Sequence, residues 1–238
     1  MMLFNKYPGS PIFRAGALIP ILVLTALTLF SCGSGGGSGS GTNGEVMGGG
    51  PAGAKAVRVV FFGDSLTEGY DLPPEQAYPA LISGKIAAAG LPYQVINAGI
   101  SGNTSADGLA RIDTVLDQPI ALFFLELGAN DSRHGVSPEV LRQNLQSILT
   151  KVKTASPQAV LVVAGMVPLT DHGAEYEAAF LQVFPDLAAA NNGILMPFLL
   201  EGVFGRSEFY STDDIHPNQA GHRAMAENIW KIIAPYLQ

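Results

Sequence analysis

The sequence predicts an α/β fold, a three-layer α/β/α sandwich in which helices cover both faces of a parallel sheet. Short apolar segments rich in β-branched and aromatic residues alternate along the chain with longer segments whose apolar residues recur at helical spacing. Strands that alternate with helices pair in parallel through right-handed crossovers. The 238 residues are 47% hydrophobic, which is enough for one large core, and the chain has no internal repeat.

Five segments are typical of strands and five of helices. Residues 120–127 are almost wholly apolar, so we expect this strand at the centre of the sheet, buried on both faces. Ser137 and Pro138 are typical of a helix start, whereas Pro185 is expected to break a later helix. The predicted strands span residues 57–62, 93–98, 120–127, 159–165 and 193–198. The predicted helices span residues 77–89, 104–116, 138–154, 174–191 and 219–236.

Residues 1–31 resemble the signal peptide of a bacterial lipoprotein. Lys6 and Arg14 precede an apolar run over residues 15–30, which is short for a transmembrane helix and typical of a signal sequence. The run ends in a segment similar to a lipobox, although Phe30 stands where a small residue is usual. We therefore expect export to the cell envelope, on the periplasmic side or at the outer membrane. An uncleaved anchor and a plain secretory signal remain as alternatives.

Cys32 is the only cysteine of the chain and the expected lipidation site. With one cysteine, no intramolecular disulfide can form, and the folded domain has no thiol for catalysis or metal binding. Residues 32–54 are rich in Gly and Ser and are predicted to be a flexible linker between the lipid anchor and a folded domain at residues 55–238. The net charge of −7 and the absence of a basic stripe exclude nucleic acid as a partner.

A serine follows the first predicted strand directly. That strand leads into Gly63, Asp64 and Ser65, and we expect Gly63 to permit a sharp turn while Asp64 holds it. Open α/β sheets bind ligands in the crevice outside the carboxyl ends of their strands, so Ser65 is a candidate nucleophile. The alternative is an ordinary turn and helix cap, in which Asp and Ser are equally common.

A histidine and an aspartate lie three residues apart just before the last predicted helix. In a turn, this spacing allows the Asp213 carboxylate to bind Nδ1 of His216 and leaves Nε2 to face a serine. Pro217 keeps His216 out of helical geometry. The alternatives are a capping Asp beside a surface His, or Asp214 in place of Asp213.

Candidate oxyanion donors lie in the loops after the second and third predicted strands. Gly102 can present its backbone N–H without a side chain, Asn130 can offer its side-chain amide, and Ser65 its own N–H. A Gly-rich turn and an Asn-Asp turn are the alternatives. His134, His172 and His222 are not spaced with acids as metal ligands, so we expect surface histidines and no metal site.

Taken together, the segments at Gly63–Asp64–Ser65–Leu66, at Gly102, at residues 128–131 and at Asp213-x-x-His216 resemble the four motif blocks of the SGNH, or GDSL, hydrolases. The resemblance spans residues 57–236 and is strongest to the bacterial arylesterases and the thioesterase I/lysophospholipase L1 enzymes. It implies a five-stranded parallel sheet in flavodoxin-like order and a serine esterase that needs no cofactor. It also implies that the loop after the fourth strand lines an acyl pocket through Met166, Val167, Pro168 and Leu169.

The expected activity is hydrolysis of carboxylic esters or thioesters through an acyl-enzyme, on small-molecule or lipid substrates. We expect a monomer held at the membrane by its N-terminal lipid. Two alternatives remain at this point: a deacetylase of cell-surface carbohydrates, and a surface lipoprotein that binds glycans or acyl chains without catalysis.

Overall fold

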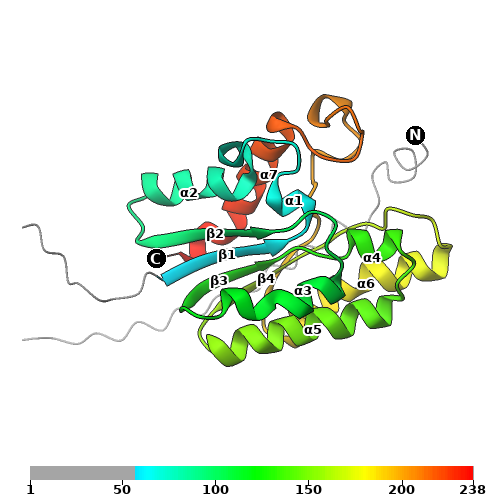
Figure 1. Ribbon diagram of the computed structural model, residues 1–238, viewed down its shortest axis with the longest axis horizontal. Coiled ribbons are helices and arrows are strands. Elements are labelled where there is room, and N and C mark those ends of the chain that lie inside the picture. Colours follow the sequence, from blue (N-terminus) through cyan, green and yellow to red (C-terminus); the bar gives the residue numbers. More distant parts are fainter. Residues whose placement is uncertain (1–56, 238) are drawn as a thin grey trace, which may run out of the picture. The chain divides into compact units, whose positions relative to one another are not determined.

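The computed structural model describes residues 57–237, so the predicted signal peptide, Cys32 and the linker lie outside the described residues (Figure 1). Five parallel strands form one sheet in the order β2-β1-β3-β4-β5, which is the flavodoxin-like order that the resemblance implied. The strands are β1 (Val57–Gly63), β2 (Tyr93–Gly99), β3 (Ile120–Leu125), β4 (Val160–Ala164) and β5 (Ile194–Met196).

Strand β3 lies at the centre of the sheet, as its composition predicted. Phe123 and Phe124, which point to opposite faces of the sheet, are both fully buried. The register pairs Phe62 of β1 with Ala98 of β2 and with Leu125 of β3. The carboxyl ends of these three strands therefore meet at one edge, where the following loops come together.

Helices cover both faces of the sheet (Figure 1). On one face α2 (Tyr78–Ala88) packs against α7 (Gln219–Ile233), and on the other α5 (Pro138–Ala155) packs between α3 (Ser105–Arg111) and α6 (Ala174–Ala190). The buried residues of α5 recur at helical spacing, so one face of the helix is apolar. They are Leu141, Leu145, Ile148, Leu149 and Val152.

The structure also contains short elements that the sequence analysis did not predict. Helices α1 (Ser65–Glu68) and α4 (Ala129–Arg133) have only one turn each, too short for a periodic pattern. The 3₁₀ segments are Pro74–Gln76, Ile112–Val115, Ser207–Phe209 and Ala234–Tyr236. Two of them replace the ends predicted for longer α-helices: α3 stops at Arg111 and α7 at Ile233. Within residues 57–237, no helix has the length and hydropathy needed to cross a membrane.

The prediction that Pro185 breaks its helix is wrong, because α6 continues through it to Ala190. A proline inside a helix costs one backbone hydrogen bond and displaces the preceding turn. Here Phe180, Phe184 and Leu187 are buried in the core on either side of the proline. Burial of three large apolar side chains stabilises the helix enough to offset that cost.

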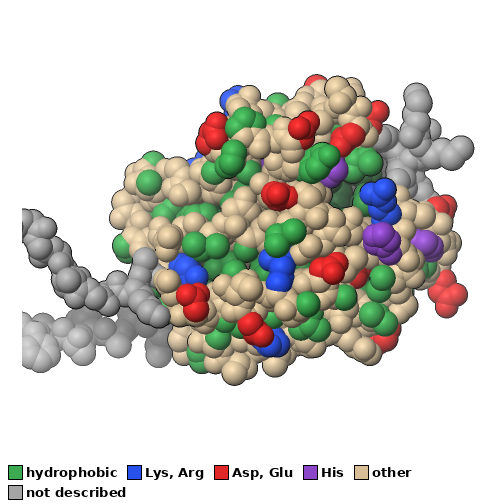
Figure 2. All heavy atoms as spheres, viewed as in Figure 1, with side chains coloured by type: hydrophobic (Ala, Val, Ile, Leu, Met, Phe, Trp, Pro, Cys, Tyr) green, Lys and Arg blue, Asp and Glu red, His purple; other side chains and the backbone are tan. Residues whose placement is uncertain are grey.

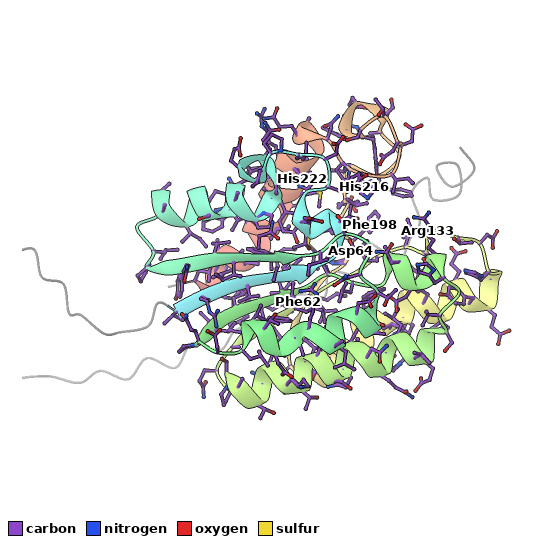
Figure 3. The ribbon with its side chains drawn as sticks, in the orientation of Figure 1. Phe62, Asp64, Arg133, Phe198, His216 and His222 are labelled. Carbon is purple, nitrogen blue, oxygen red and sulfur yellow. The ribbon has the colours of Figure 1, made fainter. Side chains whose placement is uncertain are left out.

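The prediction of surface histidines is wrong for His222, which is 1% exposed between α7 and α2 (Figure 3). Its Nδ1 accepts a hydrogen bond of 3.1 Å from the backbone N–H of Tyr78, the first residue of α2, and its ring stacks on the Tyr78 ring. Burial lowers the pKa of His222 to about 4. The side chain is therefore a neutral acceptor that joins the two helices.

His222 makes the folded protein sensitive to acid. Between pH 6.5 and 4 the unfolded chain binds a proton at this position and the folded chain does not, so the free energy of unfolding falls as the pH falls. The contribution is at most about 3 kcal/mol, from 1.36 kcal/mol for each pKa unit. We expect His222→Asn, whose Oδ1 can accept the same N–H, to lose less stability over this range.

Urea unfolding of both proteins at pH 4.5 and pH 7 measures this difference. Other titrating groups are common to the two proteins and cancel in the comparison. Equal losses of stability in the wild type and in His222→Asn would contradict the assignment.

Candidate active site

Ser65 stands at the carboxyl end of β1 as the first residue of α1. Asp64 caps this helix, because its Oδ1 accepts a 3.0 Å hydrogen bond from the N–H of Leu66. The backbone N–H of Ser65 has no partner among the described residues, as is usual in the first turn of a helix. The expectation that Asp64 holds this turn is thus confirmed.

Glycine is required at residue 63 for a reason other than the expected sharp turn. It remains in β1, paired with Gly99, and does not form the turn. A Cβ at this position would collide with Thr67 Oγ1 and with Glu126 Oε2. Glycine is therefore needed because two polar side chains pass close to the backbone just before the serine.

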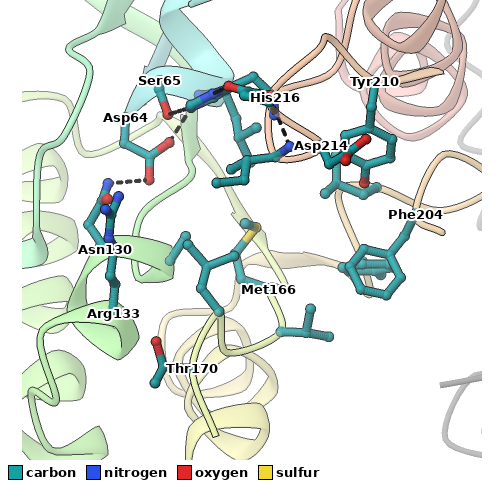
Figure 4. Close-up of a pocket in the computed structure, with 18 residues that line it drawn as sticks. Asp64, Ser65, Asn130, Arg133, Met166, Thr170, Phe204, Tyr210, Asp214 and His216 are labelled. Atoms are coloured by element: carbon teal, nitrogen blue, oxygen red, sulfur yellow. Dashed lines mark hydrogen bonds and ion pairs between the residues drawn. The ribbon is translucent and has the colours of Figure 1, made fainter. Parts of the chain in front are cut away.

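The structure brings Ser65, His216 and Asp213 together in one chain of contacts. Figure 4 labels Ser65 and His216 within this arrangement. His216 Nε2 lies 2.9 Å from Ser65 Oγ, and His216 Nδ1 lies 2.5 Å from Asp213 Oδ2. Both contacts are within hydrogen-bonding distance. Asp214, the alternative to Asp213, has no hydrogen bond to His216 among the described residues. Its backbone is left-handed, with φ 57°.

The loop that carries His216 and Asp213 is closed by its own backbone. The N–H of Ser211 donates to the carbonyl of His216 at 2.8 Å, and Tyr210 and Pro217 form a bridge beyond it. Asp213 Oδ1 accepts from the N–H groups of Ile215 and His216, each at 2.9 Å. Partial burial of Asp213 opposes ionisation, but these bonds and His216 outweigh it, and the pKa of Asp213 is lowered.

The sequence analysis did not predict that Tyr70 lies against His216. The ring of Tyr70 lies with its centroid 4.4 Å from that of the imidazole, at an angle of 35°. An aromatic face at this distance stabilises a cationic ring more than a neutral one. Tyr70 follows the helix of the serine by two residues, and no spacing in the sequence connects it with His216.

Asn130 lies on α4, beside the turn that carries Ser65. Its Nδ2 donates to Asp64 Oδ2 and to the carbonyl of Asn103, both at 3.1 Å. Gly102 has a left-handed backbone (φ 81°), its N–H has no partner among the described residues, and it does not line the cavity described below. Of the expected oxyanion donors, Ser65 and Asn130 line that cavity and Gly102 lies in the loop before Asn103.

A buried carboxyl that the sequence analysis missed lies beneath the serine. Glu126 is 0% exposed, and its Oε2 accepts from the Asp64 N–H at 3.1 Å and from Thr67 Oγ1 at 2.8 Å. Thr67 Oγ1 lies in turn 2.7 Å from the Tyr78 hydroxyl. Burial, and then the charge of Asp64, raise the pKa of Glu126 well above its usual range, and burial raises the pKa of Asp64 to about 6. Both shifts favour the protonated form of these buried carboxyls.

The sequence held one signal for this group. Glu126 is the single acid in the apolar run over residues 120–127, and an acid there has to find a partner inside the protein. Its contacts on both sides of Ser65, at residues 64 and 67, fix the turn to the end of the central strand.

A cavity of about 580 Å³ opens beside Ser65 and His216, and Figure 2 shows this hollow with hydrophobic side chains at its wall. Most of its lining is apolar. Met166, Val167 and Leu169 line the cavity, whereas Pro168 is buried and does not belong to the lining. The other apolar lining residues include Phe198, Leu200, Phe204 and Ile215.

The site shows no arrangement of metal ligands. In the part of the chain that the structure describes, no three His, Cys, Asp or Glu side chains lie close enough to hold an ion.

Comparison with known proteins agrees with this geometry. The sequence model of the GDSL-like Lipase/Acylhydrolase family matches residues 61–224. The chain belongs to this family. It is 37% identical to the esterase TesA of Pseudomonas aeruginosa over 77% of this chain and 91% of the relative. It is 34% identical to thioesterase 1/protease 1/lysophospholipase L1 of Escherichia coli, over 76% and 86% of the two chains.

A solved structure is similar as well. The esterase EstA of Pseudoalteromonas sp., inhibited by monoethylphosphonate, matches this GDSL-like hydrolase with a TM-score of 0.69 and 27% identity, over 76% of this chain and 98% of that one. The protein is therefore a serine hydrolase that acts on ester bonds. The alternative of a surface lipoprotein without catalysis is set aside.

We expect Glu126→Ala in this hydrolase to lower kcat by about 10²-fold, because misplacement of a reacting group by about 1 Å has an effect of that size. Glu126→Gln has nearly the same shape and keeps an oxygen that can accept from the Asp64 N–H and from Thr67, so we expect it to retain most of the activity. Kinetics with a soluble ester, and circular dichroism to verify folding, measure both effects.

Comparing kcat and KM of the two Glu126 variants shows whether the carboxyl positions Ser65 or only stabilises the fold. We expect kcat to change in Glu126→Ala with KM nearly constant, because the cavity that binds the substrate is not altered. A Glu126→Ala protein with wild-type kcat would contradict the role given to the carboxyl.

Proposed function

We propose that Ser65 is the nucleophile of an acyl-transfer reaction, with His216 as general base and Asp213 as the residue that orients His216. The observation that carries the proposal is the continuous contact from Asp213 through His216 to Ser65 Oγ at the mouth of an apolar cavity. Nucleophile, base and orienting carboxylate in this geometry are the requirements for serine ester hydrolysis.

Each group has one task in the reaction. Ser65 Oγ attacks the ester carbonyl carbon while His216 Nε2 takes the Oγ proton. The tetrahedral intermediate then collapses, the C–O bond to the leaving group breaks, and the imidazolium returns the proton to the leaving oxygen. Water activated by His216 releases the acid from the acyl-enzyme. Asp213, whose lowered pKa keeps it ionised, stabilises the imidazolium in both halves.

The oxyanion is proposed to bind the N–H groups of Ser65 and Gly102 and the Asn130 amide. The first two have no competing partner among the described residues, whereas both N–H bonds of Asn130 are already engaged. Asn130 therefore has to exchange one bond, to Asp64 or to Asn103, for a bond to the substrate oxygen. A donor of this kind contributes about 2.7–4 kcal/mol to the transition state.

The substrate class follows from the cavity. An apolar lining of Met166, Val167, Leu169 and the phenylalanines favours the hydrocarbon part of an acyl ester or thioester. This supports esterase or thioesterase activity on acyl chains over removal of acetyl groups from carbohydrates, which need polar contacts to the sugar.

Hydrolysis of p-nitrophenyl esters from acetyl to palmitoyl tests the proposal. We expect activity that rises beyond the acetyl ester, and we expect Ser65→Ala to lose about 10⁵–10⁶-fold in kcat. The matched control is Ser147→Ala, a serine on α5 whose hydroxyl bonds only to the Gln143 carbonyl. Full activity of Ser65→Ala would exclude the serine mechanism, and a maximum at acetyl would favour the carbohydrate deacetylase.

The N-terminal segment supports a second part of the proposal, an exported lipoprotein anchored through Cys32 and tethered by the linker at residues 32–54. We expect Cys32→Ser to leave the membrane fraction and globomycin to block maturation. Ser34→Ala, two residues away, serves as the control and should remain membrane-bound. A membrane-bound Cys32→Ser protein would contradict lipid anchoring.

A further inference from the structure

One cationic side chain lines the catalytic end of the cavity. Arg133 is the last residue of α4 and follows Asn130 by three positions, so both side chains leave the same side of the helix. Figure 4 shows them extending in the same direction, toward the end of the cavity at which Asp64 and Ser65 lie. Arg133 therefore lines the same wall of the cavity as Asn130.

Arg133 differs from most arginines of the protein in what it contacts. It has an exposed side chain and no hydrogen bond or ion pair within residues 57–237. Four other arginines are held by the fold: Arg58 by Asp117, Arg142 by Asp186, Arg206 by Glu208, and Arg111 by Asn103 and the Gly63 carbonyl. Its five donors are thus available to a ligand in the cavity.

The charged groups around the cavity suggest what Arg133 can contribute to substrate binding. The other charged lining groups are the carboxyls of Asp64, Asp213 and Asp214, and the whole chain carries a net charge of −7. These charges disfavour an anionic substrate. A guanidinium offsets them and matches the geometry of a carboxylate or phosphate, to which it binds through two parallel hydrogen bonds.

We propose that Arg133 binds an anionic group, a carboxylate or a phosphate, that the substrate carries a few bonds from its scissile ester. The inference rests on the proposed function, because Ser65 and Asn130 define where the ester carbonyl lies. Three residues of helix rise by only about 4.5 Å, so the Arg133 and Asn130 side chains start close together on the wall of the cavity. Monoacyl esters of glycerol phosphate and acyl esters of hydroxy acids have this form, with the acyl chain in the apolar cavity.

Two pairs of substrates, each with the same acyl chain, test the proposal and distinguish the sources of the anion. One pair is 1-decanoylglycerol 3-phosphate and 1-decanoylglycerol, and the other is 3-butyryloxybenzoate and phenyl butyrate. The measured quantity is the ratio of kcat/KM for the anionic substrate to kcat/KM for its neutral partner. The proteins are the wild type, Arg133→Gln, Arg133→Lys and the control Arg223→Gln, an exposed arginine of α7 outside the cavity lining.

We expect Arg133→Gln to lower the ratio at least 10-fold in one pair or both, Arg133→Lys to lower it less, and Arg223→Gln to leave it unchanged. A fall in the phosphate pair alone identifies a phosphate ligand, and a fall in the benzoate pair alone a carboxylate. An unchanged ratio in both pairs for Arg133→Gln, or equal falls in Arg223→Gln, would overturn the proposal. Failure of the proposed function is distinct, because the wild type would then hydrolyse neither neutral ester above the level of Ser65→Ala.

Discussion

The position of Ser65, the proposed nucleophile, depends on one buried carboxyl. Glu126, at the end of the central strand, accepts hydrogen bonds from residues on both sides of Ser65, the N–H of Asp64 and the hydroxyl of Thr67. Because these bonds occupy the space of a side chain at residue 63, only glycine fits there. The turn that carries Ser65 is thus held by a carboxyl that is fully buried and does not line the cavity.

The site divides between a rigid part and a loop. Ser65 and Asn130 stand on short helices that follow neighbouring strands, and the shared register of β1 and β3 fixes their separation. His216 instead comes from a loop closed by its own backbone bonds and covered by Tyr70. His216 meets the rigid part through the 2.9 Å approach of its Nε2 to Ser65 Oγ and through the Tyr70 ring, so the geometry of the site depends on where this loop lies.

Local sequence was sufficient for the fold and for the residues in short motifs. The order of strands and helices predicted the sandwich. The motifs also pointed to Ser65 and His216, which the structure brings within 2.9 Å of each other. The features that were missed depend on tertiary packing. The burial of His222, the continuity of α6 at Pro185 and the engaged amide of Asn130 each follow from neighbours distant in sequence, and no local pattern encodes them.

The most direct test of the account is covalent labelling of the nucleophile. Diethyl p-nitrophenyl phosphate transfers its phosphoryl group to an activated serine, and mass spectrometry of the intact protein and its peptides locates the adduct. We predict one adduct per chain, on Ser65, with release of one p-nitrophenolate and much slower labelling in His216→Asn. An adduct on another residue, or a folded protein that remains unlabelled, would contradict the assignment of Ser65 and His216.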